Sequence, residues 1–455
     1  MSQEKVLKVL SPTAILGYGF PESSFEEGMR RQPDVIAVDA GSTDPGPYYL
    51  GAGISFTDRN AVKRDLSLMI PAGVNAGIPV VIGTAGGSGG HPHVEVTVEI
   101  IKEIAQEQDI HFKLAVIESE FDKEFVKEKL RMGDISPLGP VAELTEKDVD
   151  EATHIVAQMG EEPFITALEA GAQVILAGRS YDPAEFAALA LKQGFDRGLA
   201  THMGKILECA AITAVPGSGG DCMLGTLYED RFVVEPMNPA RQCTALSVAA
   251  HSLYEKSDPY VLPGPGGTLD LHETKFEALS DREVQVSGTK FVPTEGYFVK
   301  LEGARLKGYR TIAPAATHDP VMISQIDSIV MQVRERVEDN FRHLGMTDIH
   351  LDFKVYGKKG VMNMFPKTPN SNSDELMIII EAVAPTQEQA DTICSFARST
   401  LLHFGYEGRI STAGNLAFPF SPSDCSMGEV YEFNVYHLMR IDDPSTPFPI
   451  RYLDL

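Results

Sequence analysis

The chain lacks tryptophan, and it contains only five cysteines among 455 residues. The cysteines are scattered and form no C-x-x-C pair, which argues against a disulfide framework or a structural zinc site and fits a reducing compartment. No apolar run reaches about 18 residues, so no membrane-spanning helix is expected. Because the first residues show no apolar segment followed by a cleavage site, we expect no signal peptide and a cytoplasmic location.

Basic residues are scarce relative to acidic ones. The 39 lysines and arginines stand against 64 aspartates and glutamates, which gives a formal net charge of −25. The sequence shows no basic stripe, so neither a nucleic acid nor a membrane is an expected partner. An anionic small molecule remains compatible with this charge, provided that its pocket supplies local Arg, Lys or N–H donors.

Several familiar site motifs are also absent. The sequence has no G-x-S-x-G elbow, no Walker motif and no H-E-x-x-H helix. The glycines of Gly86–Gly90 do not keep the G-x-G-x-x-G spacing of a Rossmann dinucleotide site. These familiar sites therefore do not account for the chain, and the sequence identifies no cofactor.

Short apolar runs alternate with amphipathic segments over the first two-thirds of the chain. The expected strands are Val35–Val38, Pro79–Ile82, Leu114–Ile117, Ile155–Ala157 and Val174–Ala177. The expected helices are Asn60–Ala76, Val94–Gln106, Asp122–Met132, Pro163–Ala170 and Leu199–Val215. This alternation predicts an α/β fold with a mostly parallel sheet flanked by helices.

The pattern changes in the last third of the chain. Residues 1–325 are predicted to form the α/β domain, with a β-rich insertion at about 227–319 marked by Gly/Pro turns. Residues 326–455 are predicted to form a smaller C-terminal α+β domain. Its expected elements are strands at Ile349–Tyr356, Glu375–Val383 and Val430–Met439, and a helix at Gln387–His403.

The segment from Val80 to Val98 combines an apolar run, a glycine-rich turn and a helical pattern. In such a unit, backbone N–H groups can face an anion at the helix N-terminus. The residues expected to bind substrate there are Gly86, Gly87, Ser88, Gly89 and Gly90. His91 follows directly, and it is a candidate acid or base because histidine titrates nearest neutrality. The alternative is a tight turn whose glycines only relieve steric crowding.

Polar residues follow the predicted strands at their carboxyl ends, where parallel sheets bind ligands. Arg179 comes after the strand that ends at Ala177, and its guanidinium is a candidate for binding a substrate carboxylate. Tyr181 is expected to contact the substrate, either as a proton donor or by packing. Asp182 precedes Pro183 and matches a helix N-cap.

A polar trio lies in the predicted helix Leu199–Val215. His202, Lys205 and Glu208 are spaced three residues apart among apolar neighbours, so we expect a partly buried catalytic group that transfers protons. The alternative is a solvated helix face with an ordinary Lys–Glu pair, which would contribute little to stability.

Asp39 and Glu118 also end apolar strands, where a carboxylate is costly unless it is paired or functional. A metal site is one alternative use of such groups: His91 and His93, with Asp39, Glu118 or Asp221, offer nitrogen and oxygen ligands. An H-x-H pattern alone does not specify a metal, so we assign no metal ligands from the sequence.

The chain as a whole resembles the acyclic terpene utilisation protein A (AtuA) family. The resemblance covers nearly all residues, and its motifs are specific to the family. The segments that carry it are Asp34–Asp44, Gly83–His93, Ala177–Pro183, His202–Glu208, Pro216–Asp221, Arg398–Arg409 and Ser411–Pro422.

The resemblance implies a catabolic enzyme for an acyclic carboxylic acid or its thioester, since the family is named after gene clusters that degrade branched acyclic terpenoids. We expect a lyase of the hydratase or dehydratase type, or an isomerase, that acts on a branched or hydroxylated acid by acid/base chemistry. One alternative is a metal-assisted hydrolase or hydratase that uses His91 and His93. Another is a non-catalytic subunit whose site is completed by a small accessory protein. We also expect a homo-oligomer.

Overall fold

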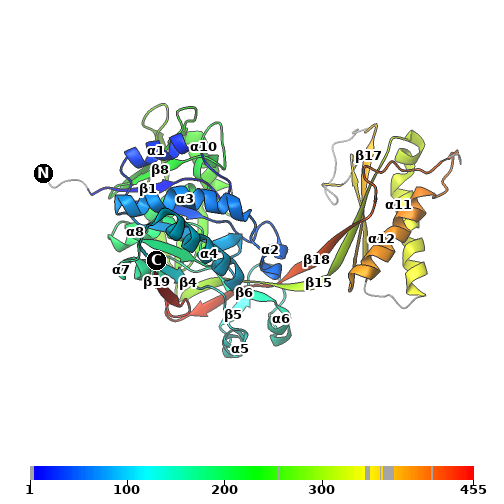
Figure 1. Ribbon diagram of the computed structural model, residues 1–455, viewed down its shortest axis with the longest axis horizontal. Helices are drawn as coiled ribbons and strands as arrows, with labels where there is room; N and C mark the ends of the chain where they lie inside the picture. The colour runs from blue at the N-terminus through cyan, green and yellow to red at the C-terminus, as the bar shows by residue number, and fades with distance from the viewer. Residues whose placement is uncertain (1–4, 255–256, 344–348, 359, 362–372, 411–412) are drawn as a thin grey trace. The chain divides into compact units, whose positions relative to one another are not determined.

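The computed structural model describes residues 5–254, 257–343, 349–358, 360–361, 373–410 and 413–455 (Figure 1). Ser411 and Thr412, which begin one of the family motifs, lie outside these ranges. The chain divides into two compact units, one formed by Met1–Arg305 with Phe433–Leu455 and the other by Leu306–Glu432. This division differs from the expected boundary at 325/326, because two long strands, β15 (Tyr297–Thr317) and β18 (Cys425–Ile441), run from one unit into the other.

A ten-stranded sheet forms the centre of the first unit. Its five inner strands are mutually parallel, and their order is β1 (Leu7–Ser11), β2 (Val35–Asp39), β3 (Val80–Gly83), β7 (Val174–Ala177) and β4 (Lys113–Ile117). Every residue of β2, β3 and β7 is buried, as expected for parallel strands covered on both faces. The predicted α/β class is therefore confirmed.

Antiparallel strands extend this sheet at both edges. On the β1 side they are β8 (Met223–Leu227), β9 (Arg231–Pro236), β13 (Val284–Ser287) and β12 (Lys275–Ala278), and on the β4 side β19 (Ile450–Asp454). A separate three-stranded sheet contains β10 (Val261–Gly264), β11 (Gly267–Asp270) and β14 (Lys290–Pro293). The region expected to be a β-rich insertion thus supplies both an extension of the main sheet and a small second sheet.

Two apolar cores lie on the two faces of the main sheet. In β2, Ile36 and Val38 belong to one core and Val35 and Ala37 to the other, as the two-residue period of a strand requires. The helices that supply the first core are α1 (Glu22–Arg30), α3 (Arg59–Ala76) and α4 (His91–Gln108). The second core takes most of its helical residues from α7 (Glu162–Glu169), α8 (Ala184–Lys192) and α9 (Arg197–Leu207). It also takes one buried residue each from α5 (Lys123–Met132), α6 (Glu146–Glu151) and α10 (Ala245–Leu253). A short helix, α2 (Pro47–Ala52), lies in the same unit.

Two predicted elements differ from the structure. The expected strand at Ile155–Ala157 is present as β6 (His154–Ala157), but it pairs antiparallel with β15 instead of joining the parallel strands. The helix expected over Leu199–Val215 ends at Leu207, and a 3-10 turn follows. Ala210 breaks the helix because its φ is +43°, a left-handed conformation.

The second unit has its own core, packed between helices and antiparallel strands. Its elements are α11 (Pro320–Arg342), β16 (His350–Tyr356), β17 (Leu376–Ala384) and α12 (Gln387–Leu402), together with parts of β15 and β18. In β17, alternate residues such as Ile378 and Ile380 are buried against the helices. Among the described helices of the whole chain, none combines the length and apolarity that a membrane crossing requires.

Candidate active site

A cavity of about 510 Å³ lies at the carboxyl ends of the parallel strands in the first unit. Its volume falls within the range typical of small-molecule sites. Three cationic side chains, two tyrosines, an amide and a carboxylate are among its lining groups: Arg179, Lys205, Lys300, Tyr181, Tyr436, Gln158 and Asp182. The cavity therefore offers the local Arg and Lys donors that an anionic ligand needs in an acidic protein.

Arg179 follows β7, and its side chain is almost completely buried. Its Nε donates to Oε2 of Glu302 at 2.8 Å, and its Nη1 donates to Oδ1 of Asp182 at 2.9 Å. Burial opposes the charged guanidinium, but the attraction of Glu302 and Asp182 outweighs burial and raises the pKa of Arg179 well above its usual value. Asp182 thus pairs with Arg179, while Pro183 takes the N-cap position of α8 that the sequence had suggested for Asp182.

Lys300 and Glu302 lie on β15 and were missed by the sequence analysis. Lys300 Nζ is 2.7 Å from Oε1 of Glu302, and the Thr43 hydroxyl donates to the same oxygen at 2.7 Å. Burial favours the neutral form of Glu302, but Arg179 and Lys300 outweigh it and lower its pKa to about 2. Their spacing was a signal that could have found them. Lys300 and Glu302 lie on either side of the buried Leu301, and residues two apart share one face of a strand.

Lys205 and Glu208 form the second charged group at the cavity. Glu208 caps the C-terminus of α9, and both residues are about 5 % exposed. Lys205 Nζ donates to Oε1 of Glu208. Tyr181 lines the same cavity, and its burial raises the pKa of its phenol, which therefore stays protonated and can act as a hydrogen-bond donor. The structure thus brings Lys205, Arg179 and Tyr181 to one cavity, with Glu208 bonded to Lys205.

Two further carboxylates, Asp39 and Glu185, are buried at the same sheet edge. Asp39 ends β2, and Glu185 in α8 accepts a hydrogen bond from the Ser180 hydroxyl at 3.2 Å. Burial, reinforced by repulsion from Asp182, raises the pKa of Asp39 well above its usual value. Burial and repulsion from Asp39 raise the pKa of Glu185 in the same way. Gly83 makes room for this group, since a Cβ there would come within 2.2 Å of Glu185 Oε1.

His202, the third member of the predicted trio, is not among the cavity's lining residues. Its Nδ1 lies 2.7 Å from Thr289 Oγ1, and its Nε2 lies 2.9 Å from Ser252 Oγ. The Ser252 hydroxyl donates to the Val248 carbonyl, so Ser252 Oγ accepts from Nε2–H and Nδ1 accepts from Thr289. Burial lowers the pKa of His202 to about 3, and the neutral imidazole has both hydrogen bonds satisfied.

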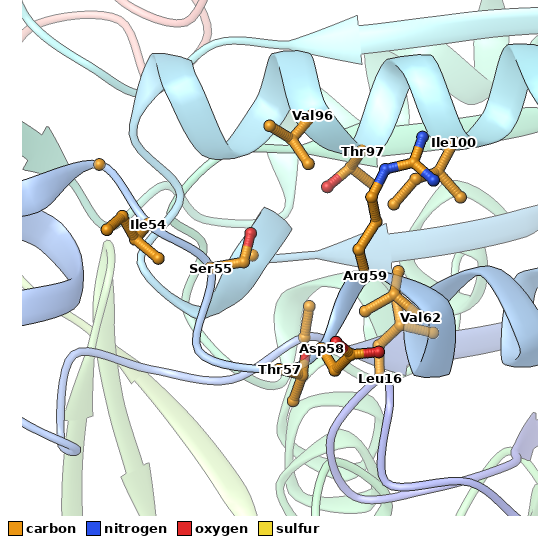
Figure 2. Close-up of a pocket in the computed structure, with 13 residues that line it drawn as sticks. Leu16, Ile54, Ser55, Thr57, Asp58, Arg59, Val62, Val96, Thr97 and Ile100 are labelled. Atoms are coloured by element: carbon orange, nitrogen blue, oxygen red, sulfur yellow. The ribbon is translucent and has the colours of Figure 1, made fainter.

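The glycine-rich loop is buried and packs closely against the segment after β7. A Cβ on Gly89 would lie 2.0 Å from the backbone nitrogen of Arg179, and the φ of Gly89 is +69°. Gly87, Ser88 and Gly90 are likewise buried. Gly86 lines a different, mainly apolar pocket of about 410 Å³, most of whose residues come from α3, α4 and the loop before α3 (Figure 2). The loop therefore touches Arg179 through its backbone, but the two do not line one cavity.

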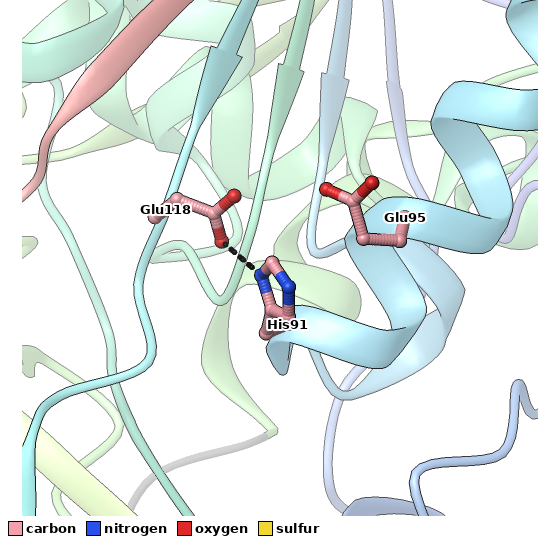
Figure 3. A group of neighbouring side chains, drawn as sticks. All are labelled: His91, Glu95 and Glu118. Atoms are coloured by element: carbon pink, nitrogen blue, oxygen red, sulfur yellow. Dashed lines mark hydrogen bonds and ion pairs between the residues drawn. The ribbon is translucent and has the colours of Figure 1, made fainter.

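His91 begins α4, and its side chain is exposed. It is not among the residues that line the cavity with Lys205. Its Nδ1 lies 3.4 Å from Oε2 of Glu118, with Glu95 one turn further along α4 (Figure 3). His93 points elsewhere: its Nε2 lies 3.1 Å from the Tyr49 and Ile54 carbonyls. The structure therefore does not bring His91 and His93 together as two ligands of one metal.

Asp221, another candidate ligand in the sequence analysis, also has partners of its own. Its Oδ2 accepts from Nε of Arg241 at 2.6 Å and from Nδ2 of Asn238 at 2.7 Å.

Taken together, the fold and cavity define an α/β protein with a cation-lined ligand site at the carboxyl edge of a parallel sheet, the usual ligand position in such sheets. The family model described as acyclic terpene utilisation family protein AtuA matches residues 59–218 and 231–416. The chain belongs to this family. No curated protein and no solved structure shows a significant match.

Proposed function

We propose that this protein is a lyase of the hydratase or dehydratase type, or an isomerase, acting on an acyclic carboxylic acid or its thioester. The observation that carries this proposal is the buried Lys205–Glu208 pair, whose lysine lines a cavity together with Arg179 and Lys300. Hydration, dehydration and isomerisation next to a carboxyl or carbonyl group need a positioned proton carrier and a cationic binding group. The family description, which names acyclic terpene utilisation, favours a branched acyclic substrate.

The three cations in the cavity have two different tasks in this proposal. Lys300 and Arg179 bind the carboxyl or thioester end of the substrate, and the buried Glu302 holds both of them in place. Lys205 transfers the proton, with Glu208 as its partner. In a dehydration, a base removes the proton at the carbon next to the carboxyl group while a protonated group assists departure of the hydroxyl as water. Tyr181, a protonated phenol in the cavity, is a suitable donor for that hydroxyl.

The test is a turnover screen with the purified full-length chain. Acyclic hydroxy, branched and unsaturated acids and their coenzyme A thioesters are incubated with the protein, and mass spectrometry records gain or loss of water while NMR records isomerisation. The proposal expects turnover by this chain alone for at least one substrate class. Turnover that appears only when a small accessory protein is added would favour the non-catalytic-subunit alternative, and hydrolysis as the sole reaction would contradict the proposal.

A further inference from the structure

Three carboxylates from separate parts of the fold converge beside the cavity. Asp39 ends β2, Asp182 follows β7, and Glu208 caps α9. One ligand oxygen from each lies within 4.8 Å of those of the other two, so a single ion can reach all three. Asp39 and Glu208 are buried, and Asp182 lines the cavity wall.

A second observation points to a missing ligand in this cluster. Asp39 is only 6 % exposed, and its Oδ1 has no hydrogen-bond partner among the described residues. Oε1 of the neighbouring Glu185, which is 1 % exposed, also lacks one within the described part of the chain. Burying a carboxylate oxygen without a donor or a cation is costly. These oxygens therefore need either protons or a metal ion.

The formal charges around the cavity lead to the same conclusion. Apart from Asp44, an exposed residue that also lines the cavity, the group has five buried or cavity-lining carboxylates, namely Asp39, Asp182, Glu185, Glu208 and Glu302. Three cations form ion pairs with these carboxylates: Arg179, Lys205 and Lys300. The described members of the cluster thus leave a formal charge of −2 if all the carboxylates are ionised. One divalent cation would neutralise this charge of −2, which otherwise requires the binding of two protons.

We propose that Asp39, Asp182 and Glu208 bind a divalent cation of the Mg²⁺ or Mn²⁺ type. All three ligands are carboxylates, and hard cations of this kind prefer oxygen donors. Each carboxylate has two oxygens, so Asp182 and Glu208 can bind the ion and still accept from Arg179 and Lys205. Because Mg²⁺ and Mn²⁺ keep open positions for water or substrate, the nearby cavity gives the ion access to a ligand.

A second group with suitable spacing, His91, Glu95 and Glu118, is the less favourable site (Figure 3). His91 is largely exposed, and both carboxylates already pair with Arg451. A cation there would have to compete with that guanidinium and with water. The same group is therefore a useful control, because it offers comparable ligand atoms without the buried, unpartnered oxygen.

Ion binding itself does not depend on the proposed function. The role of the ion as a Lewis acid toward a substrate carboxyl or hydroxyl group does rest on the proposed function. The two ideas can therefore fail separately. A chain that binds the ion but converts none of the acids would contradict only the proposed function. A chain that converts them at the full rate after the ion is removed would contradict only the Lewis-acid role of the ion, and a chain that binds no ion would contradict only the present inference.

The experiment measures Mn²⁺ binding by electron paramagnetic resonance of the chelator-stripped, full-length chain. We expect about one ion per chain, as a single three-carboxylate site requires. Asp39→Asn should weaken binding by more than the roughly 10–100-fold that losing an outer-shell partner costs. The matched control, Glu95→Gln in the exposed group, should bind Mn²⁺ as the unmodified chain does.

Two results would overturn the inference: no Mn²⁺ bound at millimolar concentrations, or Mn²⁺ binding that Asp39→Asn leaves unchanged, whatever the result for Glu95→Gln. Asp39→Asn is nearly isosteric and removes a buried charge, so the variant should fold, and circular dichroism checks this. If it does not fold, Glu208→Gln takes its place with the same expected loss of binding. Excess Mg²⁺ should displace the bound Mn²⁺, because both ions use the same oxygen ligands.

Discussion

Arg179 and Glu302 are separated by 123 positions in the chain, yet Arg179 Nε donates to Glu302 Oε2 at 2.8 Å beside the ligand cavity. The bond ties the segment after β7 to β15. Glu302 is fully buried and also pairs with Lys300, so one carboxylate orients two of the three cations that line the cavity. The geometry of the anion-binding wall therefore depends on a residue that does not itself line the cavity.

Glu302→Gln should destabilise the protein by about 3–5 kcal/mol, because removing one partner of a buried ion pair leaves uncompensated charge. Here the uncompensated charges are those of Arg179 and Lys300. Urea denaturation followed by circular dichroism measures the loss. The matched control is Glu103→Gln, which removes an exposed carboxylate that pairs with Arg59 and Lys63. The control should cost roughly 0–1 kcal/mol, and equal losses for the two variants would refute the structural role of Glu302.

Gly89→Ala tests whether the glycine-rich loop is needed for its close approach to Arg179. The added Cβ would lie 2.0 Å from the Arg179 backbone nitrogen, so the loop or the strand end has to move. Gly77 has nearly the same φ, +68° against +69°, but nothing within 4 Å of its Cβ position. Gly77→Ala therefore carries only backbone strain, on the order of 1 kcal/mol.

The melting temperatures of the two glycine variants give the comparison. We expect Gly89→Ala to melt well below Gly77→Ala, or not to fold. Similar melting temperatures would mean that the close contact at Gly89 imposes little constraint.

Stability should fall on acidification because of His202. Burial lowers its pKa to about 3, whereas in the unfolded chain it titrates near its ordinary value of about 6.5. Between these two values the unfolded state binds the extra proton, so His202 removes up to about 1.4 kcal/mol of stability for each unit that the pH falls. The contribution is fully present above pH 6.5 and lost progressively toward pH 3.

Denaturation profiles at several pH values check this for the unmodified chain and for His202→Gln, which keeps a polar side chain but cannot titrate. The profile of His202→Gln should be shallower between pH 6.5 and pH 3. Parallel profiles would contradict a neutral, buried imidazole at this position.

The parallel sheet could be predicted because its strands are buried on both faces and appear as continuous apolar runs, as in Val35–Val38. Arg179 and Lys205 could be placed near a ligand because one follows such a strand and the other is a charge among apolar neighbours. Glu302 could not be placed there from the sequence, because its partners depend on the pairing of β15 with β6, a contact between distant segments. The pairing of β19 with β4 at the edge of the main sheet could not be predicted for the same reason.

His202 illustrates a different limit of sequence analysis. A spacing of three residues suggested that it shares a site with Lys205 and Glu208. Six residues of an α-helix, however, rotate the side-chain direction by about 240°, so His202 and Glu208 leave the helix on different sides. The structure accordingly places His202 between Thr289 and Ser252, and Glu208 with Lys205.

Hydrogen exchange in D₂O measures whether Lys205 transfers a proton at the cavity. A substrate found in the screen is incubated with the unmodified chain, with Lys205→Met, and with Lys63→Met, which removes an ion-paired lysine from α3 as a control. NMR follows deuterium entering the carbon next to the carboxyl group. We expect Lys205→Met, once circular dichroism shows that it is folded, to catalyse exchange roughly 10²–10⁴-fold more slowly than the unmodified chain, and Lys63→Met to catalyse it at the normal rate. Exchange by Lys205→Met at the rate of the unmodified chain would contradict a proton-transfer role for Lys205.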